Sequence, residues 1–188
     1  MNLLTDKLPE HITVNNSQFP IKTDFKHWLK FTKILLNEKN EIKMLTNICY
    51  EVFEELPKAP INDVLSELMS FYSPPQKINS TGNGEKQNRQ YDFDYDAELI
   101  FSAFMQQYNI DLLTTNMHWW KFKALFDSLN DNTQFIKVVG FRAVNLSEIK
   151  DKEQKKYYAK MKRMYKLPDN RTEEEKEQAM NEMLAQMF

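Results

Sequence analysis

The segment Met117–Leu146, MHWWKFKALFDSLNDNTQFIKVVGFRAVNL, decides the fold of this chain. Its first helix is predicted at about residues 116–129, where apolar side chains occupy almost every direction around the helix axis. Met117, Trp120 and Ala124 line one side, and the other sides carry Trp119, Phe122, Leu125, Phe126 and Leu129. A helix that is apolar almost all round must be buried on several sides, in its own core or against a partner. The segment therefore predicts a helical packing unit.

The composition favours a mainly α fold. The chain has 188 residues, enough for one core, and its 25 basic and 27 acidic residues leave a net charge of −2. Only three glycines are present, which disfavours P-loops, dinucleotide-binding folds and turn-rich all-β folds. The single cysteine, Cys49, rules out an internal disulfide and a thiolate zinc site. It is predicted to be a buried structural thiol, because it lies in the helical stripe Ile42, Leu45, Ile48/Cys49, Val52/Phe53, Leu56.

The hydrophobic pattern predicts a short N-terminal β-hairpin followed by helices. Alternating residues at 11–14 and 18–21 flank an Asn-Asn-Ser turn, and Pro20 places the second strand at an edge. Helical stripes begin after Thr23 or Asp24, run through about residues 40–55, and resume after Pro60. Further helices are expected after Asp94–Asp96, over 116–129, after Thr133, over 151–166 and after Pro168. The run Val138–Phe141 is also compatible with a strand by propensity.

The stretch 73–90 is the main interruption of this pattern. It contains two prolines, two glycines and almost no apolar residues, which predicts a flexible insertion. Residues 1–72 are therefore expected to form the hairpin and three helices, and residues 91–188 the C-terminal helices. We expect both parts to pack as a single domain, because helices of about three turns do not easily form separate cores.

The residues that carry chemistry elsewhere do not form a recognisable site here. Asp92, Asp94 and Asp96 begin like a calcium loop, but the positions that need glycine and glutamate are Ala97 and Ala103. Asp94 and Asp96 are instead expected to cap a helix. None of the three histidines has a His or carboxylate partner at the i+4 spacing of a metal pair. We expect no catalytic residues, no metal, no cofactor and no enzyme activity.

Two C-terminal features suggest binding surfaces. The run 150–166 has eight basic residues, only two acidic residues (Asp151 and Glu153) and interleaved tyrosines. Its basic side chains either contact phosphates, or they lie on the solvent-exposed face of a helix whose other face packs on the protein. Nucleic-acid binding is the less favoured reading, since the acidic cluster Glu173–Glu177 follows. The last predicted helix, opened by a capping box at Thr172–Glu175, has a methionine-rich face that either docks on its own core or holds another chain. That face consists of Met180, Met183, Leu184, Met187 and Phe188.

Several motifs resemble a bacteriophage family. They are His118–Leu125 (HWWKFKAL), Phe141-Arg142, Lys152–Tyr158 (KEQKKYY), Tyr165–Asp169 (YKLPD) and Asp24–Trp28 (DFKHW). Together these are similar to the gene-product-fifteen family, which is found in tail-assembly gene blocks of phages and prophages of Gram-positive bacteria. The resemblance implies a role similar to that of tail assembly chaperones, which hold the tape-measure protein before the tail tube forms. It supplies no established functional residues.

These observations lead to one preferred function and two alternatives. We expect a non-enzymatic tail assembly factor in the host bacterial cytoplasm that binds the tape-measure protein or other tail proteins, with possible self-association and no membrane contact. The alternatives are a structural tail or connector component retained in the virion, and a nucleic-acid-binding regulator. Trp119, Trp120, Phe122 and Phe126 are expected to serve as scaffold or groove wall, and the methionine-rich face as the partner contact.

Overall fold

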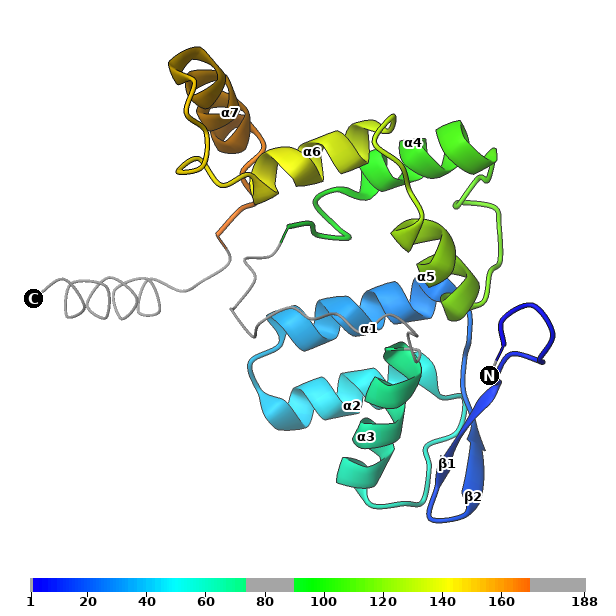
Figure 1. Cartoon of the computed structure of the whole chain (residues 1–188). Coiled ribbons are helices and arrows are strands. Elements are labelled where there is room, and N and C mark those ends of the chain that lie inside the picture. The colour runs from blue at the N-terminus through cyan, green and yellow to red at the C-terminus, as the bar shows by residue number, and fades with distance from the viewer. Residues whose placement is uncertain (1, 74–89, 170–188) are drawn as a thin grey trace, which may run out of the picture.

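The fold is mainly α with one N-terminal hairpin, as predicted (Figure 1). The computed structural model describes residues 2–73 and 90–169. Within them the elements are β1 (His11–Val14), β2 (Ser17–Pro20), α1 (Phe25–Asn37), α2 (Glu41–Val52), α3 (Ile61–Tyr72), α4 (Ala97–Tyr108), α5 (Trp119–Asp127), α6 (Gln134–Ala143) and α7 (Lys152–Met164). Residues 74–89, which make up most of the predicted insertion, and the predicted final helix lie outside the described residues.

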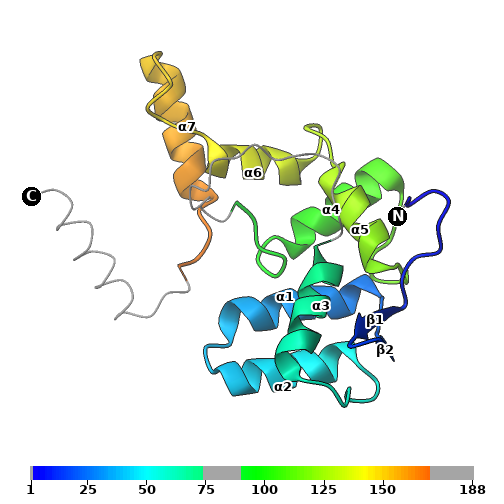
Figure 2. The same cartoon turned by 60° about the horizontal axis from the view of Figure 1, so that its bottom comes forward.

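The helices are arranged in two groups joined by α5. In Figure 1 the hairpin, α1, α2 and α3 form the lower group, and α4 and α6 lie above them. Helix α5 lies between the two groups, and α7 projects from the far end of α6 in both views (Figures 1 and 2). None of the described helices is long and apolar enough to cross a membrane.

The predicted hairpin is present, but its turn is the two residues Asn15-Asn16, because Ser17 already pairs with Val14 in the second strand. Its strands pair antiparallel, with Ile12 opposite Phe19. Asn15 and Asn16 both have positive φ, 50° and 64°, which is the conformation of a two-residue type I′ turn that asparagine tolerates. Ile12 and Val14 are buried on one face of β1, so the hairpin packs on the helices rather than standing alone.

Side-chain caps of the usual N-cap residue types fix the starts of four helices. The side chains of Asp24, Asn40, Thr133 and Asp151 accept backbone N–H bonds within the first turn of α1, α2, α6 and α7 respectively. These residue types are the preferred N-caps because their oxygens satisfy amides that lack a helical partner. The predicted starts after Asp24 and Thr133 are confirmed, and the Val138–Phe141 run is helical rather than a strand.

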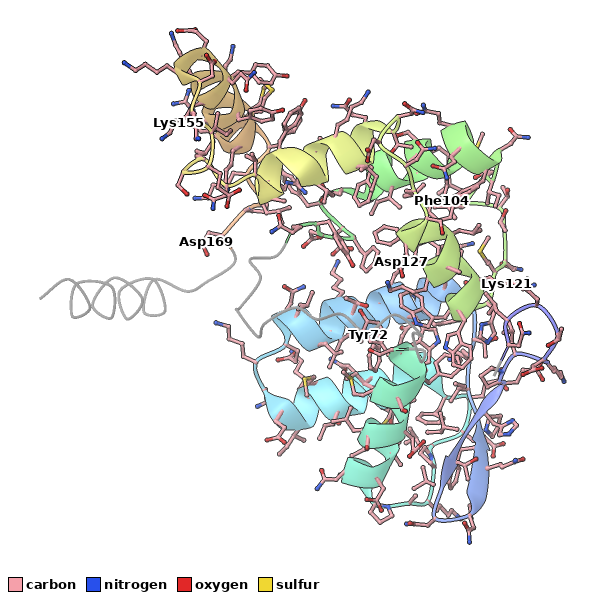
Figure 3. All side chains as sticks on the ribbon, viewed as in Figure 1. Tyr72, Phe104, Lys121, Asp127, Lys155 and Asp169 are labelled. Carbon is pink, nitrogen blue, oxygen red and sulfur yellow. The ribbon has the colours of Figure 1, made fainter. Side chains whose placement is uncertain are left out.

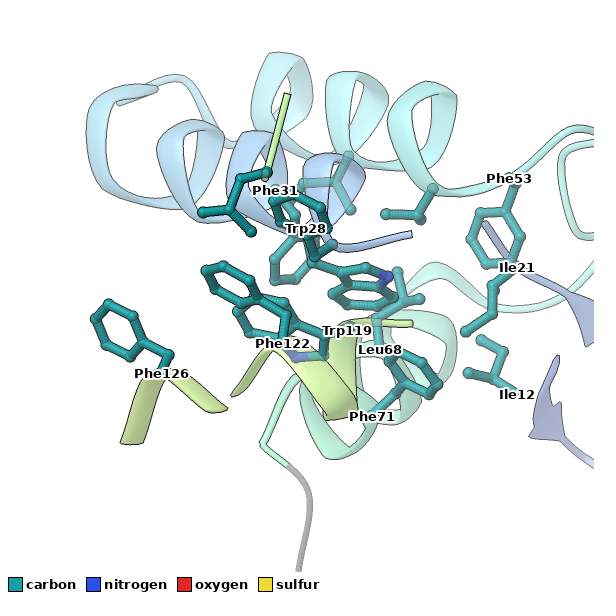
Figure 4. Packing of buried hydrophobic residues seen from close by; sticks show 14 of the residues in the cluster. Ile12, Ile21, Trp28, Phe31, Phe53, Leu68, Phe71, Trp119, Phe122 and Phe126 are labelled. Carbon is teal, nitrogen blue, oxygen red and sulfur yellow. The ribbon is translucent and has the colours of Figure 1, made fainter. Parts of the chain in front are cut away.

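The tryptophan helix α5 is the centre of the core. Trp119 and Phe122 are fully buried, and Phe126 and Leu129 are nearly so. Phe122 stacks on Phe25 of α1 and on Phe104 of α4, with ring centroids 4.7 and 5.2 Å apart (Figure 4 shows Phe122 among the buried rings). The prediction that this helix is buried on several sides is therefore confirmed.

Hydrogen bonds from the two neighbouring indoles attach α5 to the end of α3. Trp119 Nε1 donates to the Tyr72 carbonyl at 2.9 Å, and Trp120 Nε1 donates to the Phe71 carbonyl at 2.8 Å. These carbonyls belong to the last turn of α3, where the carbonyl groups of a helix have no N–H partner within the helix itself. The two tryptophans thus contribute their rings to packing, and their indole N–H groups satisfy the last carbonyls of α3.

Candidate partner-binding groove

An apolar groove runs between α2 and α3 on the lower group of helices. It has a volume of about 430 Å³ and is lined from α2 by Ile42, Leu45, Thr46, Cys49 and Tyr50, from the connection by Leu56, Pro57 and Ala59, and from α3 by Ile61 and Val64. Among the described residues, no charged side chain lines it. We call this surface the α2–α3 groove.

The groove exposes more apolar side chain than its sequence pattern suggested. Ile42, Tyr50 and Leu56 are 78%, 65% and 53% exposed, and Ile61 is 41% exposed. Ile42 and Leu56 belong to the same sequence stripe as Cys49, but only the middle of that stripe is buried. The stripe spans more than one surface, because the first turn of α2 extends beyond the core. Clustered exposed apolar residues of this kind mark binding grooves more often than isolated ones do.

Cys49 lies at this groove as a buried thiol, as predicted. Its side chain is 7% exposed, and burial raises the pKa of the thiol above its ordinary value. A raised pKa keeps the sulfur protonated at neutral pH, so it acts here as a small apolar side chain.

The aromatic residues proposed as scaffold or groove wall are mostly inside the molecule. Trp119 and Phe122 have no exposed surface and Phe126 has 5%, whereas Trp120 is half-buried. Of the two roles that the sequence leaves open for them, burial fits the scaffold. Met180, Met183, Leu184, Met187 and Phe188, the predicted partner face, lie outside the described residues.

A buried ion pair that the sequence reading missed joins α4 to α6. The Arg142 guanidinium donates to both carboxylate oxygens of Asp96, at 2.6 and 2.8 Å, and also to the carbonyls of Gln90 and Tyr165. Both side chains are less than a tenth exposed. The signal was available, since Arg142 follows Phe135 and Val138 on the buried face of α6, where a charge requires a partner.

The same pair corrects the prediction that Asp94 and Asp96 cap α4. Asp96 occupies the N-cap position, but its side chain makes no capping bond there. A bidentate bond to a guanidinium is stronger than a single cap bond from a backbone N–H, so the carboxylate turns to Arg142. Asp94 instead forms an ion pair with Lys33 of α1.

Two of the three histidines, His118 and His27, serve structural roles. His118 Nδ1 accepts the Trp120 N–H and caps α5, and its Nε2 lies 3.0 Å from the Pro9 carbonyl. His27 Nδ1 lies 2.7 Å from Glu51. Among residues 2–73 and 90–169, no group of three His, Cys, Asp or Glu side chains is placed to hold a metal ion.

Helix α7 presents a basic surface at the periphery. None of its residues, all of them described, is buried, and Tyr157 and Met164 are 51% and 55% exposed. Phe141 of α6 contacts Tyr157, Tyr158 and Tyr165, so the predicted packing face exists but covers only one side of the helix. A hollow of about 470 Å³ follows another side, lined by Glu153, Lys156, Tyr157, Ala159, Lys160 and Arg163.

Comparison with known proteins identifies the family. No curated protein and no solved structure matches this chain. A family described as Bacteriophage Gp15 protein matches residues 4–167. This range contains the α2–α3 groove, the Asp96–Arg142 pair and every motif named above except the last two residues of Tyr165–Asp169. The chain belongs to the bacteriophage Gp15 protein family.

Proposed function

We propose that this protein is a non-enzymatic phage tail assembly factor that holds apolar helical segments of the tape-measure protein in the α2–α3 groove. The observation that carries the proposal is the groove itself, which has four exposed apolar side chains and, in the described part of the chain, no charged lining residue. Membership in a bacteriophage family supports a role in particle structure or assembly. The tape-measure protein enters as the partner because the sequence resembles that of proteins from tail-assembly gene blocks.

The groove suits an amphipathic helix laid across α2 and α3. Such a helix inserts apolar residues at i, i+3 or i+4 and i+7 into a groove between two helices. Burying two or three of them yields roughly 3–9 kcal/mol of gross stabilisation, from which the cost of association is subtracted. A single site is therefore weak. Many copies acting along a long helical chain provide sufficient total affinity, and each copy still releases readily when tube subunits arrive.

The test is co-expression with the tape-measure protein from the same gene block, followed by co-purification. We expect the two chains to elute together, and the tape-measure chain to stay in solution only when this protein is present. Ile42→Asp and Tyr50→Asp should abolish the association, because each places a carboxylate in the apolar groove. Leu113→Asp is the matched control, since Leu113 is 75% exposed and lies outside the groove.

The choice of variants keeps binding separate from folding. Ile42 is largely exposed, so its replacement should change the free energy of unfolding by no more than about 0.5 kcal/mol. Trp119→Ala removes a fully buried ring and should cost about 3–5 kcal/mol, so it reports on the fold rather than on the contact. Unchanged tape-measure binding by folded Ile42→Asp and Tyr50→Asp would contradict the groove assignment.

Purified virions separate this function from that of a structural component. An assembly factor is absent from mature particles, whereas a tail or connector component is present in fixed stoichiometry. Detection of the chain at constant copy number in purified particles would replace the assembly-factor proposal with the structural one.

A further inference from the structure

The basic helix α7 lacks a packing partner on most of its surface. Its 13 residues include none that is buried, and contacts with α6 cover one side only. A helix of this length is marginal by itself in water, because its own hydrogen bonds barely offset the cost of ordering it. The exposed ring of Tyr157 and the exposed Met164 indicate that a further apolar surface belongs there.

The charges of α7 are also uncompensated. Lys152, Lys156 and Lys160 follow one another at i+4, a spacing at which like charges repel. No lysine or arginine of α7 forms an ion pair with a carboxylate in the described part of the chain. Lys162 is satisfied in another way, by donating to the Val144 carbonyl at 2.8 Å.

The chain itself carries a complementary segment directly after α7. Nineteen residues follow Asp169, and they contain five glutamates against Arg171 and Lys176. Figure 3 shows Asp169, the last described residue, at the end of the molecule where α7 and Lys155 lie. Residues 172–188 are predicted to form a helix with an acidic first half and a methionine-rich apolar face.

We propose that residues 172–188 of the same chain dock antiparallel on α7, with their acidic half against its basic face and their apolar face over Tyr157. Seven residues, 165–171, separate the two helices, and a connection of this length spans up to about 23 Å. Two antiparallel helices rise at the same rate from their connection, so residues equally distant from it face each other.

This register brings opposite charges together. Glu173 faces Arg163, and Glu177 and Met180 fall within one residue of the positions opposite Lys160 and Tyr157. These three α7 residues line the hollow on its surface. Docking then covers the exposed ring and places a carboxylate beside Lys160, one of the three mutually repelling lysines. The basic run becomes an internal docking surface, and the methionine-rich face is withdrawn from other partners while it is docked.

Hydrogen–deuterium exchange of the full chain, read by mass spectrometry, tests this proposal. At low ionic strength the amides of 172–188 should exchange at least about ten times more slowly than in Glu173→Lys/Glu177→Lys. Adding Lys160→Glu and Arg163→Glu to that variant should restore protection, because the charges are exchanged between the two helices. Salt of about 1 M should weaken the protection, since it screens exposed charges.

Glu54→Lys/Glu55→Lys is the matched control, because it makes the same charge change at exposed residues after α2 and should leave the exchange unchanged. Three results would overturn the proposal. They are rapid exchange of 172–188 in the unmodified chain, protection that falls on dilution and so reveals a second copy, and protection that survives charge reversal but is lost in Ile42→Asp. Tape-measure binding is measured separately on the same variants, so failure of either proposal is distinguishable from failure of the other.

Discussion

His118 shows how one side chain links the N-terminal segment to the central helix. It caps α5 through Nδ1, which must be unprotonated to accept the Trp120 N–H, and Nε2 then carries the proton towards the Pro9 carbonyl. This arrangement requires the neutral imidazole. Burial lowers the pKa of His118 below its ordinary value, and the nearby Lys121 lowers it further.

Acid should therefore weaken the fold through His118. Because its pKa is lower in the folded than in the unfolded state, the unfolded chain binds the extra proton, and stability rises with pH. The contribution is complete above the ordinary pKa of about 6.5 and is lost as the pH falls below it. We expect urea unfolding to show a larger drop in the free energy of unfolding between about pH 7.5 and pH 5.5 for the native chain than for His118→Asn. Asparagine keeps the cap and does not titrate, so an equal drop in both proteins would refute this role.

Residue roles were the hardest feature to predict from the sequence. Histidine is not among the usual N-caps, and the carboxylates of Asp94 and Asp96 looked like caps because they precede a helix. Their actual partners, Lys33 and Arg142, are distant in the sequence. A local pattern gives no information about which of two available partners a carboxylate takes, and here the charged one prevails over the backbone amide.

At the scale of elements, Arg142 fixes how three segments meet. From α6 its guanidinium contacts Asp96 at the start of α4, Gln90 before it, and Tyr165 at the end of α7. Its charge is buried, so its energy depends on the Asp96 carboxylate staying in place as its partner.

Asp96→Asn should lower the free energy of unfolding by about 3–5 kcal/mol, because it leaves the guanidinium buried without a counter-charge. The double variant Asp96→Asn/Arg142→Met should be less destabilised than Asp96→Asn alone, since it removes the unpaired charge as well. Chemical denaturation of the three proteins measures both effects. Additive losses in the double variant would mean that the two residues act independently.

The elements themselves followed well from the sequence. Periodic apolar residues, turn residues and caps act within a few positions, so the hairpin at Asn15-Asn16 and the helix starts at Asp24 and Thr133 were predictable. The α2–α3 groove was not. Periodicity marks Ile42 and Cys49 as one stripe, and only the packing of elements distant in the sequence decides that Cys49 is buried while Ile42 is exposed.

At the scale of the whole molecule, the core depends on contacts between distant parts of the chain. The Asp24 carboxylate accepts the Met117 N–H across 93 residues, and the Trp28 and Trp119 rings stack with centroids 6.4 Å apart. One cluster of buried residues includes Ile12 of the hairpin and Phe135 of α6. Residues from both halves of the sequence bury one another in this cluster, so neither half forms a complete core without the other.

A chain ending at residue 73 should therefore not fold, because Phe25 and Trp28 would lose Phe122 and Trp119. We expect it to show the red-shifted tryptophan fluorescence of exposed indoles, and to gain native-like emission when residues 90–188 are supplied as a second fragment. The intact chain is the reference. A cooperative thermal transition in the isolated 1–73 fragment would show two independent domains instead of the single domain expected from the sequence.

Cys49 has a practical consequence for work in cell extracts. It is the only thiol of the chain and lines the α2–α3 groove with 7% of its surface exposed. Its high pKa makes alkylation slow, and a helix seated in the groove shields the sulfur further. If a helix occupies the groove as we propose, the rate at which iodoacetamide modifies Cys49 in the native chain gauges that occupancy, and mass spectrometry reads it without attaching any label.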